Sequence, residues 1–122
     1  MKGIIVDTSS ILFGVAKRID VFEKIKEEFP RYKIVMPSGV MDELKGIGKG
    51  RRKESINARY ALKMLKDKDV EIVQSGYEVD GWIVKNAAAM GCEVCTNDAE
   101  LRKRLRAEGV RIVSLGLGGS LR

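Results

Sequence analysis

Short β-branched segments alternate with longer amphipathic segments along the whole chain. Five segments have the length and composition of buried strands, and they cover residues 4–6, 33–36, 70–73, 94–96 and 110–115. Apolar side chains recur at helical spacing in residues 10–18, 20–29, 38–47, 54–66 and 80–90 and in the stretch closed by Gly109. Strands that alternate with helices predict an α/β fold with a central parallel sheet that helices cover on both faces.

The chain has 122 residues, which is enough for one domain with a core and too few for two. We predict a single domain over residues 1–115. The glycine-rich residues 116–122 are expected to form a flexible tail. No apolar stretch is long enough to cross a membrane, and the N-terminal residues lack a signal-peptide pattern, so we expect a cytoplasmic protein.

An acidic residue follows each of the first four predicted strands. Asp7 comes directly after the first strand, and Asp98 follows the fourth. Glu43 lies on the flank of the apolar stripe of the helix after the second strand, whereas Asp42 points toward solvent. Asp80 opens the helix after the third strand, on its apolar side. Because the segments that leave the carboxyl ends of parallel strands converge on one edge of the sheet, we expect the four carboxylates to share one site.

Two of these acids, taken alone, have a simpler explanation. Asp7 could link strand to helix through an Asx-turn or an N-cap, and Asp80 could be the N-cap of its helix. Ser9 or Ser10 could cap the first helix, and Ser38 is expected to cap the third. The hypothesis of a shared site rests on the repetition of one pattern at four strand ends.

The chain contains no histidine and two cysteines. The absence of histidine excludes a histidine general base, a Ser-His-Asp triad and histidine-ligated zinc. Cys92 and Cys95 have the C-x-x-C spacing, but no second pair completes a zinc ribbon, and Cys95 falls within a predicted strand. We interpret both cysteines as structural.

Carboxylates gathered at one edge of a sheet need a compensating charge. Two like charges ~4 Å apart repel by about 4 kcal/mol at an effective dielectric constant of ~20. A shared proton, basic side chains or a divalent cation would offset this repulsion. All-oxygen ligands favour Mg²⁺ or Mn²⁺ over zinc or copper. With no histidine present, a water activated by such an ion is the expected nucleophile.

The formal net charge of +6 favours a polyanionic partner. Residues 46–53 form a glycine-punctuated basic segment that we expect to be a mobile loop. The segment is not a nucleotide P-loop, because no strand precedes it and no Lys-Ser or Lys-Thr follows it. Its side chains could contact phosphates or could simply be solvated, and the candidates for phosphate contacts are Lys49, Arg51, Arg52 and Lys53.

Four pieces of the chain together resemble the motifs of the PIN-domain nucleases. They are Ile5-Val6-Asp7-Thr8-Ser9, Val40-Met41-Asp42-Glu43-Leu44, Val79-Asp80-Gly81-Trp82-Ile83 and Thr96-Asn97-Asp98. The resemblance covers nearly the whole chain in the right order. It implies a three-layer α/β/α sandwich and Mg²⁺- or Mn²⁺-dependent cleavage of RNA. By this match the metal-binding and catalytic acids are Asp7, Glu43, Asp80 and Asp98, with Ser9 and Thr96 as polar supports beside them.

Within the family, residues 96–105 look more like archaeal and ribosomal-RNA-processing members than like VapC-type toxins. The alternatives are a VapC-type toxin ribonuclease and a catalytically inactive RNA-binding PIN module. The resemblance leaves open a homodimer, an antitoxin or RNA-processing partner, and a supporting role for Glu100 at the site. A haloacid-type phosphatase or a receiver domain fits poorly, because Ser9 stands where the phosphatase needs a second aspartate and the last strand offers no lysine.

Replacement of Arg51, Arg52 and Lys53 by alanine should weaken RNA binding and flatten its salt dependence. Each basic side chain that contacts a phosphate releases counter-ions, and these contacts would be lost. Titration of labelled RNA with the wild type and the variant at several salt concentrations measures both effects. An unchanged salt slope would mean that this segment is only a solvated surface.

Overall fold

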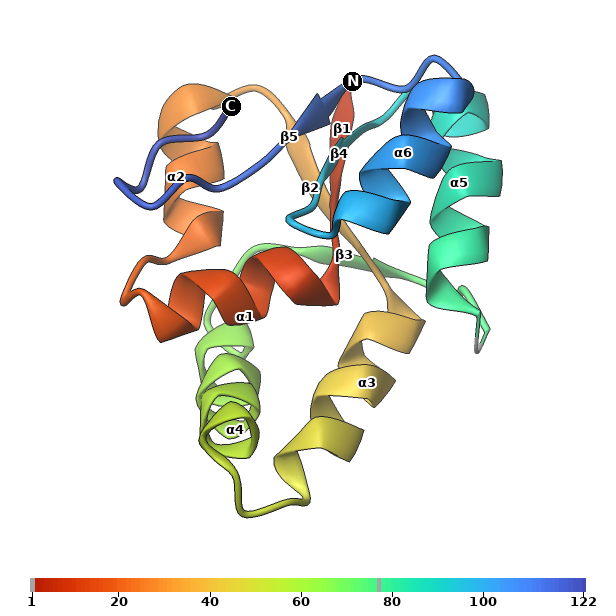
Figure 1. Ribbon diagram of the computed structural model, residues 1–122. Helices are drawn as coiled ribbons and strands as arrows, with labels where there is room; N and C mark the ends of the chain where they lie inside the picture. Colours follow the sequence, from red (N-terminus) through yellow and green to blue (C-terminus); the bar gives the residue numbers. More distant parts are fainter. Residues whose placement is uncertain (1, 77) are drawn as a thin grey trace.

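The computed structural model describes residues 2–76 and 78–122, and these residues form a five-stranded parallel sheet with helices around it (Figure 1). The strands are β1 (Gly3–Val6), β2 (Lys33–Pro37), β3 (Glu71–Val73), β4 (Glu93–Cys95) and β5 (Ile112–Val113). Their order in the sheet is β3-β2-β1-β4-β5, and every neighbouring pair is parallel. The chain therefore builds outward from β1 in one direction and then from β4 in the other.

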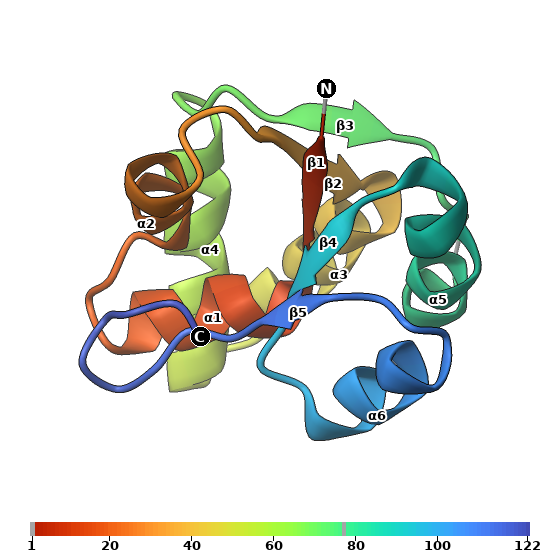
Figure 2. The ribbon, with the colours of Figure 1, turned by 90° about the horizontal axis from the view of Figure 1, so that it is seen from above.

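Helices cover both faces of this sheet. They are α1 (Thr8–Ala16), α2 (Val21–Glu28), α3 (Ser38–Gly48), α4 (Lys53–Leu65), α5 (Val79–Met90) and α6 (Ala99–Ala107). Figure 2 shows α1, α2 and α4 on one side of the sheet and α5 and α6 on the other. The predicted three-layer α/β/α sandwich with a central parallel sheet is confirmed.

The core explains why the first strand has no polar position. Ile4, Ile5 and Val6 are completely buried, because helices cover both faces of the sheet at its centre. Both cysteines are free and buried, and burial raises the pKa of the Cys95 thiol to about 12, as expected for a structural residue. In the part of the chain that the structure describes, no helix has the length and apolar composition needed to cross a membrane.

The fifth strand is shorter than predicted. Only Ile112 and Val113 pair with β4, because β4 ends at Cys95. Beyond Val113 a side chain takes the place of the backbone partner in the neighbouring strand: the N–H of Leu115 donates to Oδ1 of Asn97 (3.0 Å). The sequence pattern could not show this, since Leu115 is as apolar and as buried as a strand residue.

Half of the basic segment expected as a mobile loop at residues 46–53 is helical. α3 continues to Gly48 and α4 begins at Lys53, so only residues 49–52 connect them. The guanidinium of Arg59 donates to the carbonyl oxygens of Gly48 (2.5 Å) and Gly50 (3.0 Å). The loop prediction was wrong at residues 46–48, because the sequence does not show that Arg59 turns back onto the end of α3.

Residues 116–122 turn back beside β5. Leu121 forms an antiparallel bridge with Leu115, and the N–H of Arg122 donates to the carbonyl oxygen of Ser114 (2.8 Å). The N–H of Leu121 also donates to Oε2 of Glu28 (3.3 Å). These contacts define where the segment lies, whereas its flexibility in solution stays a prediction.

A close approach between α3 and the start of α5 brings two of the predicted site helices together. A Cβ on Gly39 would lie 2.4 Å from Cγ2 of Val79 and 2.8 Å from the carbonyl oxygen of Gly76. The N–H of Gly39 donates to Oγ of Ser75 (2.9 Å), and Oγ of Ser38 accepts the N–H of Ser75 (3.1 Å). Ser38 thus joins two segments and does not cap α3, so that prediction was wrong.

Gly39→Ala should destabilise the protein by roughly 1–3 kcal/mol, because the added methyl group has no room between α3 and α5. Gly46→Ala is the matched control in the same helix: its Cβ would meet nothing within 4 Å. That substitution should stabilise the protein by about 0.5–1 kcal/mol. Urea unfolding of both variants measures the two effects, and a Gly39→Ala protein as stable as the wild type would contradict the close approach.

Candidate active site

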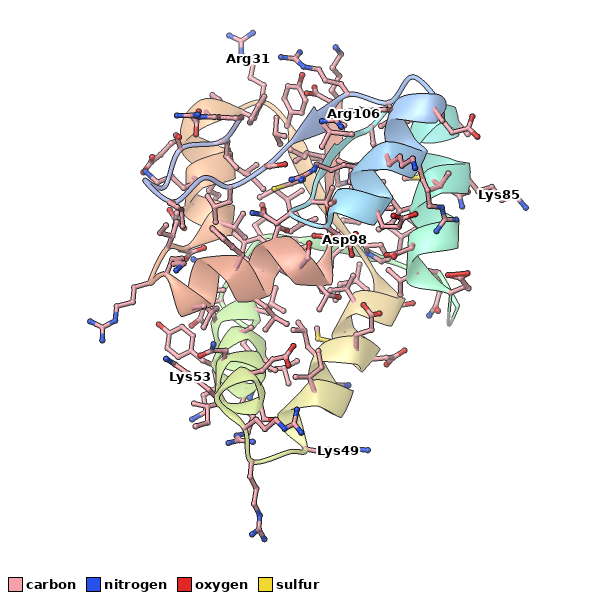
Figure 3. The ribbon with its side chains drawn as sticks, in the orientation of Figure 1. Arg31, Lys49, Lys53, Lys85, Asp98 and Arg106 are labelled. Atoms are coloured by element: carbon pink, nitrogen blue, oxygen red, sulfur yellow. The ribbon has the colours of Figure 1, made fainter. Side chains whose placement is uncertain are left out.

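The four predicted acids line one cleft at the carboxyl edge of the sheet. Asp7 follows β1, Asp98 precedes α6, and Glu43 and Asp80 project from α3 and α5 into the same cleft, whose volume is about 540 Å³. The cleft lies beside the boundary between β1 and β4, where the strand order reverses and ligands of such sheets usually bind. Figure 3 labels Asp98 at the start of α6. The prediction that these carboxylates line one cleft is confirmed, and their roles in metal binding and catalysis stay a prediction.

Asp7 is the most enclosed of the four acids, with 3% of its surface exposed. Its Oδ1 accepts the N–H of Ser10 (2.9 Å), so Asp7 is the N-cap of α1 as well as a cleft residue. The hydroxyls of Ser9 (2.8 Å) and Thr96 (2.5 Å) donate to its Oδ2. Burial raises the pKa of Asp7, and the hydrogen bonds from Thr96, Ser10 and Ser9 act in the opposite direction.

Ser9 and Thr96 also tie the end of β1 to the segment after β4. Oγ1 of Thr96 accepts the N–H of Asp98 (3.1 Å), and Oγ of Ser9 accepts the N–H of Asn97 (3.0 Å). The same two hydroxyls therefore hold Asp7 and set the position of Asp98 relative to it. These contacts fit the expected role of polar supports, while a role in catalysis stays a prediction.

Glu43 is an exposed residue of α3 that a hydroxyl from α1 holds in place. Oγ1 of Thr8 donates to Oε1 of Glu43 (2.5 Å) across 35 positions of sequence. Thr8 was not among the predicted site residues. The sequence could have indicated Thr8 through its position directly after Asp7, at the carboxyl end of the first strand.

Asp80 lies in the first turn of α5 and is not its N-cap. Glu78 occupies that position, and its Oε1 accepts the N–H of Gly81 (3.4 Å). The capping explanation of Asp80 is therefore wrong. Burial, followed by the negative charges of the other three acids, raises the pKa of Asp80, and the positive charge of Arg104 acts in the opposite direction. The cleft thus holds more negative charge than its surroundings compensate.

A fifth carboxylate, from Glu54 in the first turn of α4, also lines the cleft. The sequence offered no signal for it beyond its place next to the basic segment. Glu100, whose contribution the sequence left open, lies in the first turn of α6 and is not one of the cleft-lining side chains.

The predicted phosphate-contacting side chains lie outside the cleft walls. Four exposed basic residues lie in the turn between α3 and α4 and at the start of α4, at the end of the helical hairpin far from the sheet (Figure 3). They are Lys49, Arg51, Arg52 and Lys53. Their position suits contacts with a strand of nucleic acid that extends beyond the cleft, and the contacts themselves stay a prediction.

The donor set of the cleft fits a divalent cation of the Mg²⁺ or Mn²⁺ class. Within residues 2–76 and 78–122, no three His, Cys, Asp or Glu side chains already have the spacing of metal ligands, so the acids do not form a closed coordination sphere. The donors are nevertheless oxygens, and burial together with the charges of the neighbouring acids raises the pKa of Asp80. A cation would supply the missing compensation.

Comparison with known proteins places the chain in a family. The model of the PIN like domain matches residues 4–117. The chain belongs to the PIN-like domain family. Ribonuclease VapC9 of Archaeoglobus fulgidus is 29% identical to this PIN-like protein over 109 residues, which cover 88% of this chain and 78% of the relative. The resemblance inferred from the four sequence motifs is confirmed.

Solved structures share the fold of this PIN-like protein. The PIN domain endonuclease Utp24 superimposes with a TM-score of 0.80 and 28% identity, over 98% of this chain and 89% of that chain. VapBC2 from Rickettsia felis, bound to a DNA fragment from its promoter, matches with a TM-score of 0.66 and 16% identity, over 93% of this chain and 98% of that chain. The second likeness is one of fold alone.

Asp80→Asn should stabilise the metal-free PIN-like protein by less than about 1 kcal/mol, because it removes one repelling charge that solvent partly screens. The folded state raises the pKa of Asp80, so it binds this proton more tightly than the unfolded state does. The destabilising effect is therefore absent below the unfolded pKa and grows as pH rises through the folded pKa. Urea unfolding in chelator across this pH window measures the change in stability. Asp42→Asn, at an exposed position of α3, is the control.

The same variant should respond less to metal. Mn²⁺ that binds only the folded state raises the melting temperature of the wild type by linkage. Loss of a ligand should reduce that rise in Asp80→Asn but not in Asp42→Asn. Equal metal-induced shifts in all three proteins would remove Asp80 from the set of ligands.

Proposed function

We propose that this protein is a divalent-metal-dependent endoribonuclease that hydrolyses phosphodiester bonds in RNA. The observation that carries the proposal is the convergence of four carboxylates from separate parts of the chain on one cleft at the carboxyl edge of the sheet. The similarity to Ribonuclease VapC9 and to the PIN domain endonuclease Utp24 supports it.

The residues that hold Mg²⁺ or Mn²⁺ in this proposal are Asp7, Glu43, Asp80 and Asp98. A bound ion of this class would stabilise negative charge on the phosphate and would lower the pKa of a water molecule beside it, which makes that water easier to deprotonate. Charge compensation by the ion also allows a phosphate to enter a cleft that otherwise repels it.

Three hydroxyl side chains orient two of these carboxylates. Ser9 and Thr96 hold Asp7 through their hydroxyls, and Thr8 holds Glu43. Positioning of this kind matters for the rate, since a displacement of about 1 Å at a reacting centre can cost ~100-fold. In this proposal, the basic side chains of the turn between α3 and α4 bind phosphates of the RNA outside the reacting centre.

An RNA-processing ribonuclease is the first interpretation, and a VapC-type toxin ribonuclease is the second. The similarity to VapC9 supports the toxin interpretation. A groove of about 500 Å³ is lined by the end of α1, by residues 18–20 and by α4. Two apolar side chains of α4 stand exposed beside it, Ile56 at 55% and Tyr60 at 61%. In the toxin interpretation an antitoxin covers this groove, and a homodimer is a further proposal for the same apolar surface.

Glu43→Gln should lower the rate of metal-dependent RNA cleavage by roughly 100-fold or more, since loss of an outer-shell partner alone costs about 10–100-fold. Asp42→Asn changes the neighbouring residue of α3, which is exposed and outside the cleft, and should leave the rate unchanged. Cleavage of labelled RNA with Mn²⁺, with Mg²⁺ and with chelator measures this. RNA binding without cleavage under all metal conditions would instead favour the inactive RNA-binding module.

A further inference from the structure

A second cleft lies at the amino edge of the sheet, opposite the acids. Its volume is about 980 Å³, and its walls come from the amino ends of β2 and β3, the residue before β1, and the end of α2 with the loop that follows. Four of its lining side chains are basic, and they are Lys2, Lys26, Arg31 and Lys33. We call it the amino-edge cleft.

Positive charge predominates in the amino-edge cleft. Its two acidic residues are Asp69 and Glu71, and Nζ of Lys33 pairs with Oε2 of Glu71 at 2.9 Å. Lys2, Lys26 and Arg31 are exposed, and within residues 2–76 and 78–122 none of the three forms a salt bridge. Figure 3 shows Arg31 extending into solvent, at the end of the molecule opposite Lys49. Three cations are therefore available to a ligand.

The cleft also offers apolar surface between these cations. Pro30, Ile34 and Val70 line it together with the half-buried ring of Tyr32. The ring of Tyr32 packs edge-on against Phe29, with centroids 5.0 Å apart and planes at 61°. Apolar and aromatic surface flanked by Lys and Arg is the combination that single-stranded nucleic acids use, because their bases stack while their phosphates pair with cations.

We propose that the amino-edge cleft is a second binding site for single-stranded RNA, separate from the acidic cleft. The inference rests on the proposed ribonuclease function for the identity of the ligand. Five carboxylates line the acidic cleft and repel phosphates, so the energy that holds a long substrate has to come from cations elsewhere. β1 separates Lys2 from Asp7 by roughly 16 Å at ~3.3 Å per residue. A long strand can occupy both clefts, and a very short one cannot.

The test compares two triple variants that remove the same charge. Lys2, Lys26 and Arg31 are replaced by glutamine in one, and the exposed residues Lys17, Lys63 and Lys85 in the other. Binding is measured by fluorescence anisotropy in chelator, with single strands of about 30 and about 5 nucleotides, because single-strand sites commonly span ~4–16 nucleotides. Chelator prevents metal-dependent cleavage, so binding is measured by itself.

The amino-edge variant should bind the longer RNA roughly tenfold more weakly than the wild type, and the slope of log K against log salt should fall in magnitude by about 2. The control variant should lose far less affinity. Equal losses in the two variants would overturn the proposal. Cleavage of the short strand with Mn²⁺ tests the acidic cleft separately, so its failure would refute the ribonuclease function while the binding result stands.

Glu71→Gln gives a test in the opposite direction that does not depend on removing cations. It releases Lys33 from its salt bridge and should strengthen binding of the longer RNA by about 2-fold, more than Glu108→Gln does at the exposed residue that follows α6. Unchanged affinity of Glu71→Gln for the longer RNA would contradict the proposed binding site. Tighter binding of polyglutamate than of RNA, lost in the amino-edge variant, would identify an acidic protein segment as the ligand and overturn the assignment to RNA.

Discussion

The buried carboxylate of Asp7 is the constraint on which the active cleft depends. A charge so enclosed costs several kcal/mol unless hydrogen bonds replace its water. The donors come from the start of α1 and from Thr96 after β4, and Thr96 in turn accepts the N–H of Asp98. The hydrogen bonds that satisfy the Asp7 carboxylate therefore also join the ends of β1 and β4, the two neighbouring strands at the centre of the sheet.

The other carboxylates are brought toward Asp7 against their mutual repulsion. Gly39 lets α3 approach the first turn of α5 so closely that a methyl group would not fit. Burial of Asp80, together with the negative charges of its acidic neighbours, raises the pKa of its carboxyl group. Three of the four acids sit at the N-terminal ends of α1, α5 and α6, where the partial positive charge of a helix offsets part of the cost. In the proposed function, a bound cation would offset the rest of this repulsion.

Acidic and basic side chains occupy different parts of the molecular surface. The protein has a net charge of +6, yet its cleft at the carboxyl edge is lined by acids. Basic side chains gather instead on the turn between α3 and α4 and around the amino-edge cleft. In the proposed function, the net positive charge attracts a polyanion to the surface, and a bound cation would let its phosphate approach the acids.

The sequence by itself determined the type of fold and the edge at which the acids meet. Apolar runs and helical stripes are local patterns, and parallel connections deliver the residues after each strand to the same edge, so Asp7, Glu43, Asp80 and Asp98 could be grouped without coordinates. Pattern alone did not reveal the strand order, because several orders satisfy the same alternation.

The tertiary structure decided the contacts that join distant segments. Glu78 rather than Asp80 caps α5, Thr8 holds Glu43 across 35 positions, Glu54 enters the cleft from α4, and Arg59 shortens the basic loop. Each depends on the direction in which a side chain leaves its helix once neighbouring elements have packed. That direction is a property of the assembled core, and a one-dimensional pattern of polar and apolar residues does not contain it.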